Sequence, residues 1–169
     1  MNKFYPDRYF DDIYMARTEL FRERGIKGII FDIDNTLAPY EDELPNQKVR
    51  DYLSELEKAG IKIAFVSNNH KERVEKFNVF GYYADYDAGK PSKRAIAKAM
   101  ARLGTTPENT ALCGDQIFTD IYAGKRMGLF CVLVKPIKDK KTLFFRTKRL
   151  LEKPILKRYM KNQNDGEKT

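Results

Sequence analysis

Short strand-like runs that alternate with stretches of helical spacing constrain the fold of this chain more than any other feature. The runs cover residues 28–31, 61–66, 82–86, 110–113 and 129–134. The stretches with helical spacing cover residues 45–59, 70–80, 91–103 and 117–127. Parallel strands need crossover connections, and these connections pack back onto the sheet as helices. The alternation therefore predicts an α/β fold, a Rossmann-like three-layer sandwich with a central parallel sheet.

Polar residues follow several of these runs at their carboxyl ends. Asp32 and Asp34 follow the first run, Ser67 and Asn68 follow the second, and Asp115 follows the fourth after one glycine. In open α/β sheets, ligands bind at this edge, at the point where the strand order reverses. The sequence therefore predicts a functional site that is built from these side chains.

The carboxylates of Asp32 and Asp34 stand one residue apart at the end of a buried strand. Alternate strand residues share one face, so two like charges there need compensation. A divalent cation supplies it, and hard oxygen ligands suit Mg2+, which takes one or two protein carboxylates and completes its shell with water and phosphate oxygens. Taken alone, the motif fits a solvated Asp-rich turn equally well.

Two further charged residues extend the pattern. Lys90 stands between Gly89 and Pro91, just ahead of a predicted helix, and Asp120 follows Asp115 by five residues. A lysine in this place would set fixed positive charge opposite the oxygens of a phosphoryl group. A surface lysine at a helix start is the alternative.

These motifs resemble, in their order, those of the haloacid dehalogenase superfamily of phosphatases, and the resemblance covers about residues 26–134. It implies a HAD-like fold with Asp32 as the nucleophile and Asp34 as the general acid and base. It also implies substrate contacts from Ser67, Asn68 and Lys90, and metal contacts from Asp32, Asp34 and Asp115. Asp120 would touch the metal through water or orient Lys90.

The residue types support the same chemistry. A carboxylate is a weak nucleophile, but Mg2+ that bridges it to a phosphate oxygen aligns the two groups and screens their repulsion. Asp32 would then carry an aspartyl-phosphate, while Asp34 would protonate the leaving alkoxide and later take a proton from the hydrolytic water. We expect a Mg2+-dependent phosphomonoester hydrolase.

The gaps between the motifs leave no room for a cap domain, which phosphatases of this superfamily commonly insert there. Residues 37–66 are filled by a linker, one helix and a strand, and residues 68–89 hold one helix and a short run. An open site needs help to exclude water. A homodimer, or a large substrate such as a protein, a nucleic-acid end or a lipid head group, would provide it.

The positive charge of the chain lies in one part. The 169 residues include 32 Lys and Arg against 24 Asp and Glu, a net charge of +8. Residues 1–134 hold 20 of each sign, whereas residues 135–169 hold 12 basic and 4 acidic residues. We therefore expect a neutral phosphatase core at 1–134, with an amino-terminal extension at 1–25, and a basic amphipathic tail at 135–169.

In this tail, basic residues interleave with apolar ones, and Pro154 is expected to divide it into two helical pieces. The apolar residues are Leu143, Phe144, Phe145, Leu150, Leu151, Ile155, Leu156, Tyr159 and Met160. The basic residues are Lys140, Lys141, Arg146, Lys148, Arg149, Lys153, Lys157 and Arg158. Such a helix suits an anionic membrane surface, where each nearby Lys or Arg contributes about 1 kcal/mol. The same residues could instead pack on the sheet or hold RNA phosphates.

A narrower resemblance, to the capless phosphatases of the YqeG type found in bacteria, runs over nearly the whole chain. The segments Pro6-Asp7-Arg8-Tyr9, Asp12-Ile13-Tyr14, Gly25-Ile26-Lys27-Gly28, Asp32 to Leu37 and Ser67-Asn68-Asn69 carry it. This branch is similar to the mitochondrial phosphatidylglycerophosphate phosphatases of fungi and plants. The resemblance implies a phosphatidylglycerophosphate phosphatase in phosphatidylglycerol and cardiolipin synthesis. The alternatives are a phosphatase of a soluble sugar or nucleotide phosphate, and an RNA-associated or interaction protein that retains the fold; no RNA-binding signature supports nucleic acid as a partner.

The remaining features bear on location and on residues outside the motifs. The amino terminus has no apolar signal core and no run is long enough to span a membrane, so we expect a cytoplasmic protein that binds peripherally to the inner face of the membrane. Cys113 and Cys131 lie in apolar runs, which is typical of reduced, buried thiols. His70, the one histidine, is interpreted as a loop residue outside catalysis.

Overall fold

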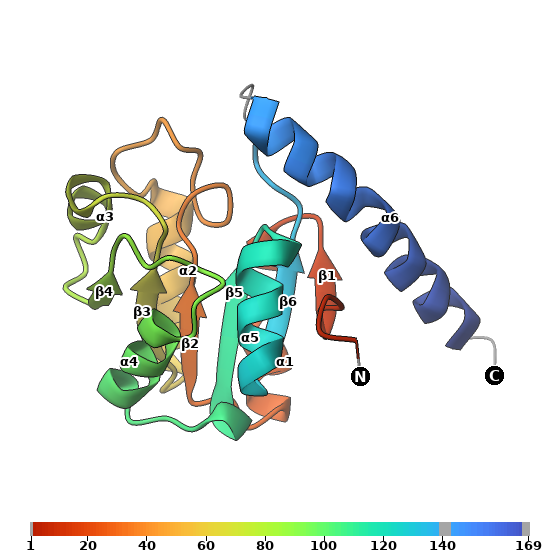
Figure 1. The fold of residues 1–169 in the computed structure, drawn as a ribbon. Coiled ribbons are helices and arrows are strands. Elements are labelled where there is room, and N and C mark those ends of the chain that lie inside the picture. Colours follow the sequence, from red (N-terminus) through yellow and green to blue (C-terminus); the bar gives the residue numbers. More distant parts are fainter. Residues whose placement is uncertain (1, 139–142, 167–169) are drawn as a thin grey trace.

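The computed structural model describes residues 2–138 and 143–166, and the side chains of residues 2–138 and 147–163. Its centre is a parallel sheet of six strands in the order β1-β6-β5-β2-β3-β4 (Figure 1). The strands are β1 (Arg8–Phe10), β2 (Gly28–Phe31), β3 (Lys62–Val66), β4 (Tyr83–Asp85), β5 (Thr110–Gly114) and β6 (Phe130–Val134). The predicted α/β fold with a central parallel sheet is thus confirmed.

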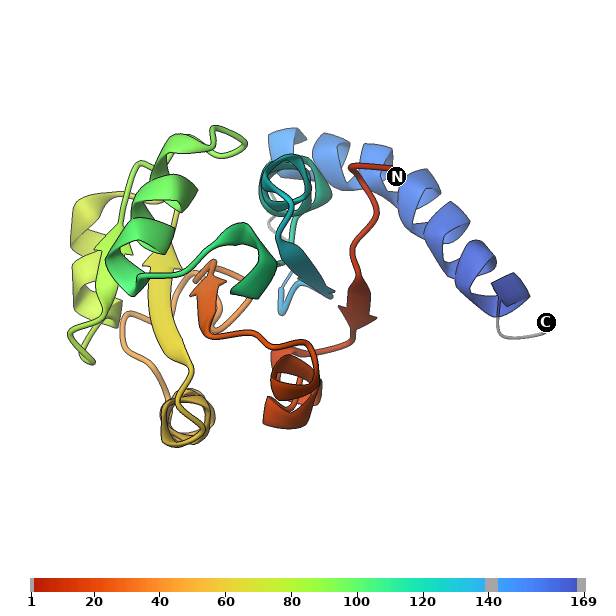
Figure 2. The same ribbon diagram turned by 90° about the horizontal axis from the view of Figure 1, so that it is seen from below.

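Helices cover both faces of the sheet, which makes the three expected layers (Figure 2). One face carries α1 (Thr18–Glu23), α2 (Gln47–Lys58) and α3 (Lys71–Phe77). The other carries α4 (Arg94–Leu103), α5 (Tyr122–Met127) and part of α6 (Leu143–Gly166). Short turns of other helix types lie at Ile13–Met15, Pro107–Asn109 and Ile117–Ile121, the last a π-helix. Within residues 2–138, no cap domain is inserted into this framework, as the short gaps between the motifs predict.

In the helices that were predicted from the spacing of apolar residues, these apolar residues are buried. Val49, Leu53 and Leu56 of α2 are fully buried against one face of the sheet. Asn46 caps this helix, since its side chain accepts a hydrogen bond of 3.0 Å from the Val49 amide. At the end of α4, Gly104 adopts a φ of 67°, a left-handed conformation that favours glycine. Local sequence signals therefore set these boundaries.

The strand order reverses between β2 and β5, which are neighbours in the sheet. From β2 the chain proceeds outward through β3 and β4, and from β5 it proceeds the other way through β6. Loops that leave the carboxyl ends of β2 and β5 therefore diverge and leave a crevice between them. The residues that directly follow these strands, Asp32 and Asp115, stand at this crevice.

The amino-terminal extension contributes a strand that the sequence did not predict. Residues 8–10 form β1, which pairs in parallel with residues 132–134 of β6 at the edge of the sheet. Three residues are too few to show an alternation of apolar and polar side chains. The segment is fixed by distant partners, because Asp7 accepts a 2.7 Å hydrogen bond from the Cys131 amide and pairs with Lys125 at 2.8 Å.

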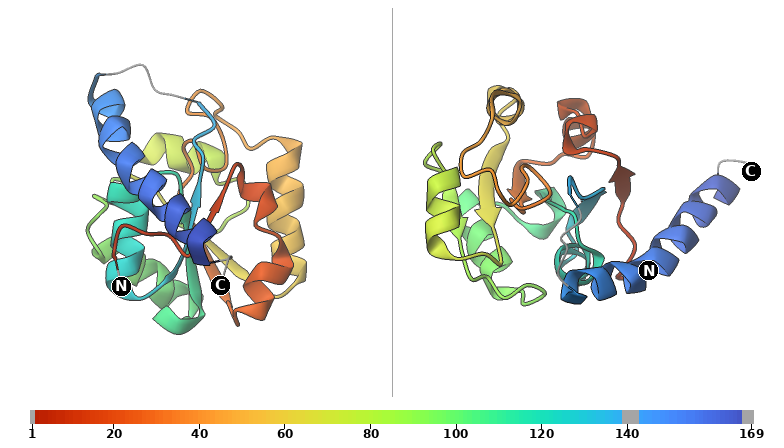
Figure 3. Two further views of the ribbon diagram at one scale, coloured as in Figure 1. Left: turned by 90° about the vertical axis from the view of Figure 1, so that its right-hand side faces the viewer. Right: turned by 90° about the horizontal axis from the view of Figure 1, so that it is seen from above.

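Within the basic tail, residues 143–166 form one continuous helix, α6, so the expected division at Pro154 is wrong. A proline inside a helix removes the hydrogen bond to the carbonyl four residues earlier, here that of Leu150. Leu150 is 62% exposed, so water can take up this carbonyl and the helix continues. Figure 3 shows α6 running obliquely across the molecule, with its carboxyl end reaching beyond the sheet.

One side of α6 packs against the rest of the molecule. Ile155 and Leu156 pack against the core beneath α4 and α5, and the ring of buried Tyr159 meets Tyr5 edge-on at 5.8 Å. The tail residues Lys140, Lys141, Leu143, Phe144, Phe145 and Arg146 lie outside the described side chains. Among the described ranges, no helix combines the length and the apolar character that a membrane span requires.

Candidate active site

Asp32 is fixed directly beyond β2 by the main chain and by neighbouring polar side chains. Its amide donates to the Cys113 carbonyl at 2.9 Å, which extends the pairing of β2 with β5 by one residue. Its Oδ1 accepts a hydrogen bond of 2.7 Å from Lys90 Nζ, and Thr36 Oγ1 lies 3.5 Å from its Oδ2. Only 6% of the residue is exposed. Asp32 therefore presents a carboxylate that is buried and held in one orientation.

Lys90 lies at the centre of the site, and 1% of its side chain is exposed. Its Nζ donates hydrogen bonds of 2.7 Å to Asp32 Oδ1 and to the Val66 carbonyl. It also makes an ion pair of 2.7 Å with Asp120 Oδ1. Burial by itself would lower the pKa of Lys90, but the carboxylates of Asp120 and Asp32 outweigh it and raise the pKa. This lysine is therefore a fixed cation and no surface residue.

Asp115 and Asp120 complete a group of buried carboxylates with Asp32. One oxygen from each of the three lies within 4.8 Å of the others. Asp120 also accepts a 3.1 Å hydrogen bond from the Gln116 amide through Oδ2. Asp115 Oδ1 is buried and has no hydrogen-bond partner among the described residues. Three carboxylates with an unpartnered oxygen are a donor set that fits a hard divalent cation.

Gly114 lets Asp120 approach the strand. A Cβ at this position would lie 2.5 Å from both Cβ and Cγ of Asp120, closer than such atoms can come. The π-helix Ile117–Ile121 carries Asp120 back over the end of β5 into that space. The glycine that precedes Asp115 is thus needed for the geometry of the acid five residues further on.

Burial changes the acidity of two of these carboxyls. Burial raises the pKa of Asp32 to about 8, although Lys90 opposes the shift. Burial likewise raises the pKa of Asp115 to about 6, against the opposing charge of Arg149. A cation among these groups would favour their ionised forms. A bound cation would therefore lower the pKa of both carboxyls.

Asp34 lies apart from this group, and its carboxylate faces other partners. Its Oδ1 is 3.2 Å from both Nε and Nη2 of Arg73, and its Oδ2 accepts a 2.8 Å hydrogen bond from Asn69 Nδ2. About 12% of its side chain is exposed. Nothing in the sequence pointed to Arg73, which stands among the other charged residues of α3. The arrangement holds the Asp34 carboxylate in one orientation at the rim of the site.

Ser67 and Asn68 lie at the end of β3, beside Lys90. The Ser67 hydroxyl accepts a 3.0 Å hydrogen bond from the Asn69 amide, which leaves its own proton to donate. The Asn68 side chain binds the main chain of Lys90 twice, through its carbonyl at 2.7 Å and its amide at 3.1 Å. Asn68 thereby fixes the segment that carries the lysine.

Three residues that were interpreted as non-catalytic lie outside this cluster. Cys113 and Cys131 are buried free thiols, and burial raises the pKa of both. His70 is exposed at the start of α3, with its Nδ1 2.8 Å from Asp87 Oδ1.

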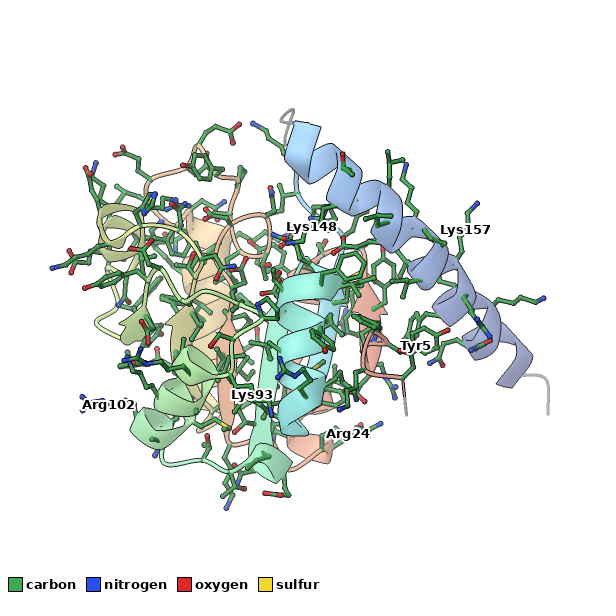
Figure 4. The ribbon with its side chains drawn as sticks, viewed as in Figure 1. Tyr5, Arg24, Lys93, Arg102, Lys148 and Lys157 are labelled. Atoms are coloured by element: carbon green, nitrogen blue, oxygen red, sulfur yellow. The ribbon has the colours of Figure 1, made fainter. Side chains whose placement is uncertain are left out.

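The tail helix α6 reaches the site, which the sequence did not indicate. Arg149 makes a short ion pair with Asp115 and donates a 2.6 Å hydrogen bond to the Asp115 carbonyl. Lys148 donates to Gln116 Oε1 at 2.7 Å. Figure 4 shows Lys148 on the side of α6 that faces the core, whereas Lys157 points away from it. Because the tail is basic throughout, no local signal separates the residues that serve the site from those that face solvent.

A parallel α/β sheet with acids, a lysine and a hydroxyl at its carboxyl edge belongs to the class of α/β proteins that bind ligands at this edge, and its charged groups suit a phosphoryl group. Comparison with known proteins gives the family. The model of haloacid dehalogenase-like hydrolases matches residues 38–128. The probable phosphatase YqeG of Bacillus subtilis (strain 168) is 33% identical over 154 residues, which cover 90% of this chain and 90% of that protein. The chain belongs to the haloacid dehalogenase-like hydrolases.

Other relatives agree with this assignment. Phosphatidylglycerophosphate phosphatase 1, chloroplastic/mitochondrial, of Arabidopsis thaliana is 29% identical over 163 residues, 89% of this chain but 46% of the plant protein. The crystal structure of CbbY from Rhodobacter sphaeroides in complex with phosphate has a TM-score of 0.56 at 16% identity, covering 70% of this chain and 90% of that one. A hydrolase of HAD subfamily III A from Legionella pneumophila has a TM-score of 0.50 at 20% identity, covering 72% and 75%. The predicted resemblance is confirmed, and the chain is a phosphatase of HAD type.

Proposed function

We propose that this protein hydrolyses phosphomonoesters with Mg2+ through an aspartyl-phosphate on Asp32. The observation that carries the proposal is the buried group of Asp32, Asp115 and Asp120, in which Asp32 and Asp120 both pair with Lys90. A surface turn would not bury three acids and a lysine together. The proposal assigns the phosphatase chemistry to the core at residues 1–134.

Asp32 and Asp115 would hold the metal, with Asp120 behind them on Lys90. Bound there, Mg2+ supplies positive charge to the phosphate oxygens and to the attacking carboxylate. Asp34 was a third candidate from the sequence. Since its carboxylate lies outside that group of acids, where Arg73 and Asn69 orient it, we assign it to proton transfer.

The chain's own residues account for the two half-reactions. An oxygen of Asp32 attacks phosphorus, the bond to the ester oxygen breaks, and Asp34 gives its proton to that oxygen. Water then attacks the phosphorus of the aspartyl-phosphate and passes a proton to Asp34, which releases phosphate and regenerates Asp32. The Ser67 hydroxyl and Lys90 donate to the phosphoryl oxygens throughout.

For the substrate we propose phosphatidylglycerophosphate or a closely similar lipid phosphate. A cavity of about 230 Å³ opens beside Asp115, between α6 and the end of β6. Its walls include apolar side chains such as Ile117, Leu133 and Leu156. Its charged lining residues are the cations Lys135, Arg149 and Lys153 and the acids Asp115 and Glu152. Apolar walls with nearby cations suit a phosphate that carries an apolar group. The plant relative named above is a phosphatidylglycerophosphate phosphatase, which supports the same substrate.

The outer side of α6 would hold the enzyme at the inner face of the membrane. Leu150 and Leu151 are 62% and 60% exposed, and they share this side with the exposed Lys157, Arg158 and Lys161. Exposed leucines among lysines and arginines are typical of helices that lie in an anionic lipid surface. The open site would then meet a head group that the bilayer itself presents, so that no cap is needed.

The test is phosphate release from phosphatidylglycerophosphate in mixed micelles, with and without Mg2+, beside a panel of soluble phosphomonoesters that includes glyceraldehyde 3-phosphate. Rapid turnover of the lipid that depends on Mg2+ and disappears in Asp32→Asn supports the proposal. Turnover confined to soluble esters would reject the lipid substrate and retain the mechanism. An inert protein would favour an interaction role for the fold.

A further inference from the structure

We infer that Arg149 is a positioning residue for Asp115, so that the tail helix α6 completes the active site of the core. The inference rests on the proposed function in one respect, since it takes Asp115 as a metal-binding acid. It adds a residue from outside the four motifs and gives a catalytic reason for the docking of the tail.

The guanidinium of Arg149 binds Asp115 at two points. Its Nη2 pairs with Asp115 Oδ2, and its Nη1 donates a 2.6 Å hydrogen bond to the Asp115 main-chain carbonyl. A planar fork that binds the carboxylate and the backbone of the same residue fixes the rotation of that side chain. Lysine, with a single ammonium group, could not match this geometry.

Glu152, one turn further along α6, holds the guanidinium in place. Its Oε2 is 2.9 Å from Arg149 Nη1, and its Oε1 accepts a 3.2 Å hydrogen bond from the Phe118 amide. The two residues of α6 thus bind both ends of the loop between Asp115 and Phe118. Glu152 is 5% exposed, so its contacts with Arg149 and with the Phe118 amide are buried.

The pairing leaves the other oxygen of Asp115 for a ligand. Oδ2 is occupied by Arg149, while Oδ1 is buried and has no hydrogen-bond partner within the described part of the chain. The carboxylate therefore sits in the group with Asp32 and Asp120 with one oxygen engaged and one free. A residue that binds one oxygen of a carboxylate orients the other oxygen toward a metal in this way.

Docking of α6 by itself does not require this network. Ile155, Leu156 and Tyr159 already provide apolar contacts for the helix. Buried ion pairs are often no more stabilising than apolar residues of the same volume, because the charges must leave water. A partly buried Arg149–Glu152 pair on a site acid is better explained by the position that it imposes on Asp115.

Arg149 could act on metal binding in two opposite ways. Its positive charge repels Mg2+, but its contacts orient the Asp115 carboxylate for metal binding. Because the guanidinium binds Oδ2 and leaves Oδ1 for the metal, we expect the orienting effect to be the larger one. Loss of such an outer contact typically weakens metal binding by about 10- to 100-fold.

The experiment measures the Mg2+ dissociation constant of the full-length protein by calorimetry, together with kcat and KM for p-nitrophenyl phosphate. Arg149→Gln should weaken Mg2+ binding by about 10- to 100-fold. It should also raise the Mg2+ concentration needed for half-maximal activity by a similar factor, with KM at saturating Mg2+ nearly unchanged. The Mg2+ affinity of Arg149→Lys should lie between those of the wild type and Arg149→Gln. Arg102→Gln, an exposed arginine on α4, should bind Mg2+ like the wild type and serves as the matched control.

A folded Arg149→Gln that binds Mg2+ as tightly as the wild type, or more tightly, would overturn the inference. If that variant does not fold, Glu152→Gln decides, because the amide side chain would keep an acceptor for the Phe118 N–H but lose the charge that holds Arg149. An unchanged Mg2+ affinity in it would overturn the inference. Failure of the wild type to bind Mg2+ would overturn both this inference and the proposed function, whereas normal wild-type binding with unaffected variants would overturn this inference alone.

Discussion

The edge of the sheet at β2 and β5 and the helix α6 hold their charged residues by different means. At the sheet edge, main-chain hydrogen bonds fix the charged residues, since the Asp32 amide bonds to the Cys113 carbonyl and β2 is paired with β5 along its whole length. On α6, side-chain contacts fix them, through Arg149, Lys148 and a few apolar residues. The acids are therefore built into the fold, whereas their surroundings can be altered without dismantling the sheet.

The largest expected effect comes from the sheet edge. Asp32→Asn should lower kcat/KM by about 10⁴-fold or more, because an amide of the same shape cannot attack phosphorus. The fold should survive, since asparagine has the same shape and its side-chain oxygen can still accept the hydrogen bond from Lys90 Nζ. Asp87→Asn, which alters an exposed acid bonded to His70, should stay near wild-type activity. Measurable turnover by Asp32→Asn would show that another residue is the nucleophile.

Gly114→Ala tests the geometry at the end of β5. The added methyl would meet Asp120 at 2.5 Å, so the acid must move away from Lys90. We expect a loss of about 1–3 kcal/mol in the free energy of unfolding and about a hundredfold loss in kcat, measured by urea denaturation and steady-state kinetics. Gly25→Ala has open space but a φ of 66°, so it should lose stability without losing kcat. Equal kcat in the two variants would show that Asp120 has no part in the site.

The pH dependence of metal binding should be steeper than that of an exposed acidic site. With the pKa of Asp32 at about 8 and that of Asp115 at about 6, both raised by burial, the folded metal-free protein retains protons that Mg2+ must displace. Its affinity for Mg2+ should therefore fall by up to about tenfold for each pH unit between 8 and 6, and by up to about a hundredfold per unit below 6, where both carboxyls carry protons.

The same protons affect stability in the metal-free protein. In the unfolded chain Asp32 loses its proton above the ordinary pKa of 3.8, whereas in the folded protein it keeps the proton up to about pH 8. The free energy of unfolding should therefore fall as the pH rises from about 4 to 8. Calorimetry and thermal unfolding between pH 5 and 8 measure both trends. A metal affinity that does not change over this range would show that the acids are already ionised.

The smallest effect on stability is expected at the outer side of α6. Leu150→Ser with Leu151→Ser should change the free energy of unfolding by less than about 0.5 kcal/mol, because both leucines are exposed. Binding to anionic vesicles should nevertheless fall several-fold. Leu156→Ser, on the side that packs against the core, should instead destabilise the protein. Vesicle binding that survives the double substitution would place the membrane contact elsewhere.

How much the sequence could predict depended on whether a feature is local. Asp32 and Ser67 follow an apolar run directly and Asp115 follows one after a single glycine, so the sheet alone brings them to one edge. The partners of these residues are not local. Arg73 reaches Asp34 from 39 positions away, and Arg149 reaches Asp115 from 34. Their neighbours in sequence are equally charged, so only the packing of α3 and α6 distinguishes them.

Pro154 and β1 show the same limit in the fold. The sequence indicates that proline disfavours a helix interior, but whether the freed carbonyl meets water depends on which side of α6 faces out. Likewise, residues 8–10 become a strand because β6 offers a free edge to pair with. Both outcomes are decided by contacts that no short segment encodes.

The contact between Arg149 and Asp115 also joins two segments that are made at different times. A ribosome makes the chain from its amino end, so β2 and β5 exist before residue 149 does. The segment that carries the acids is thus synthesised before the helix that supplies the guanidinium of Arg149.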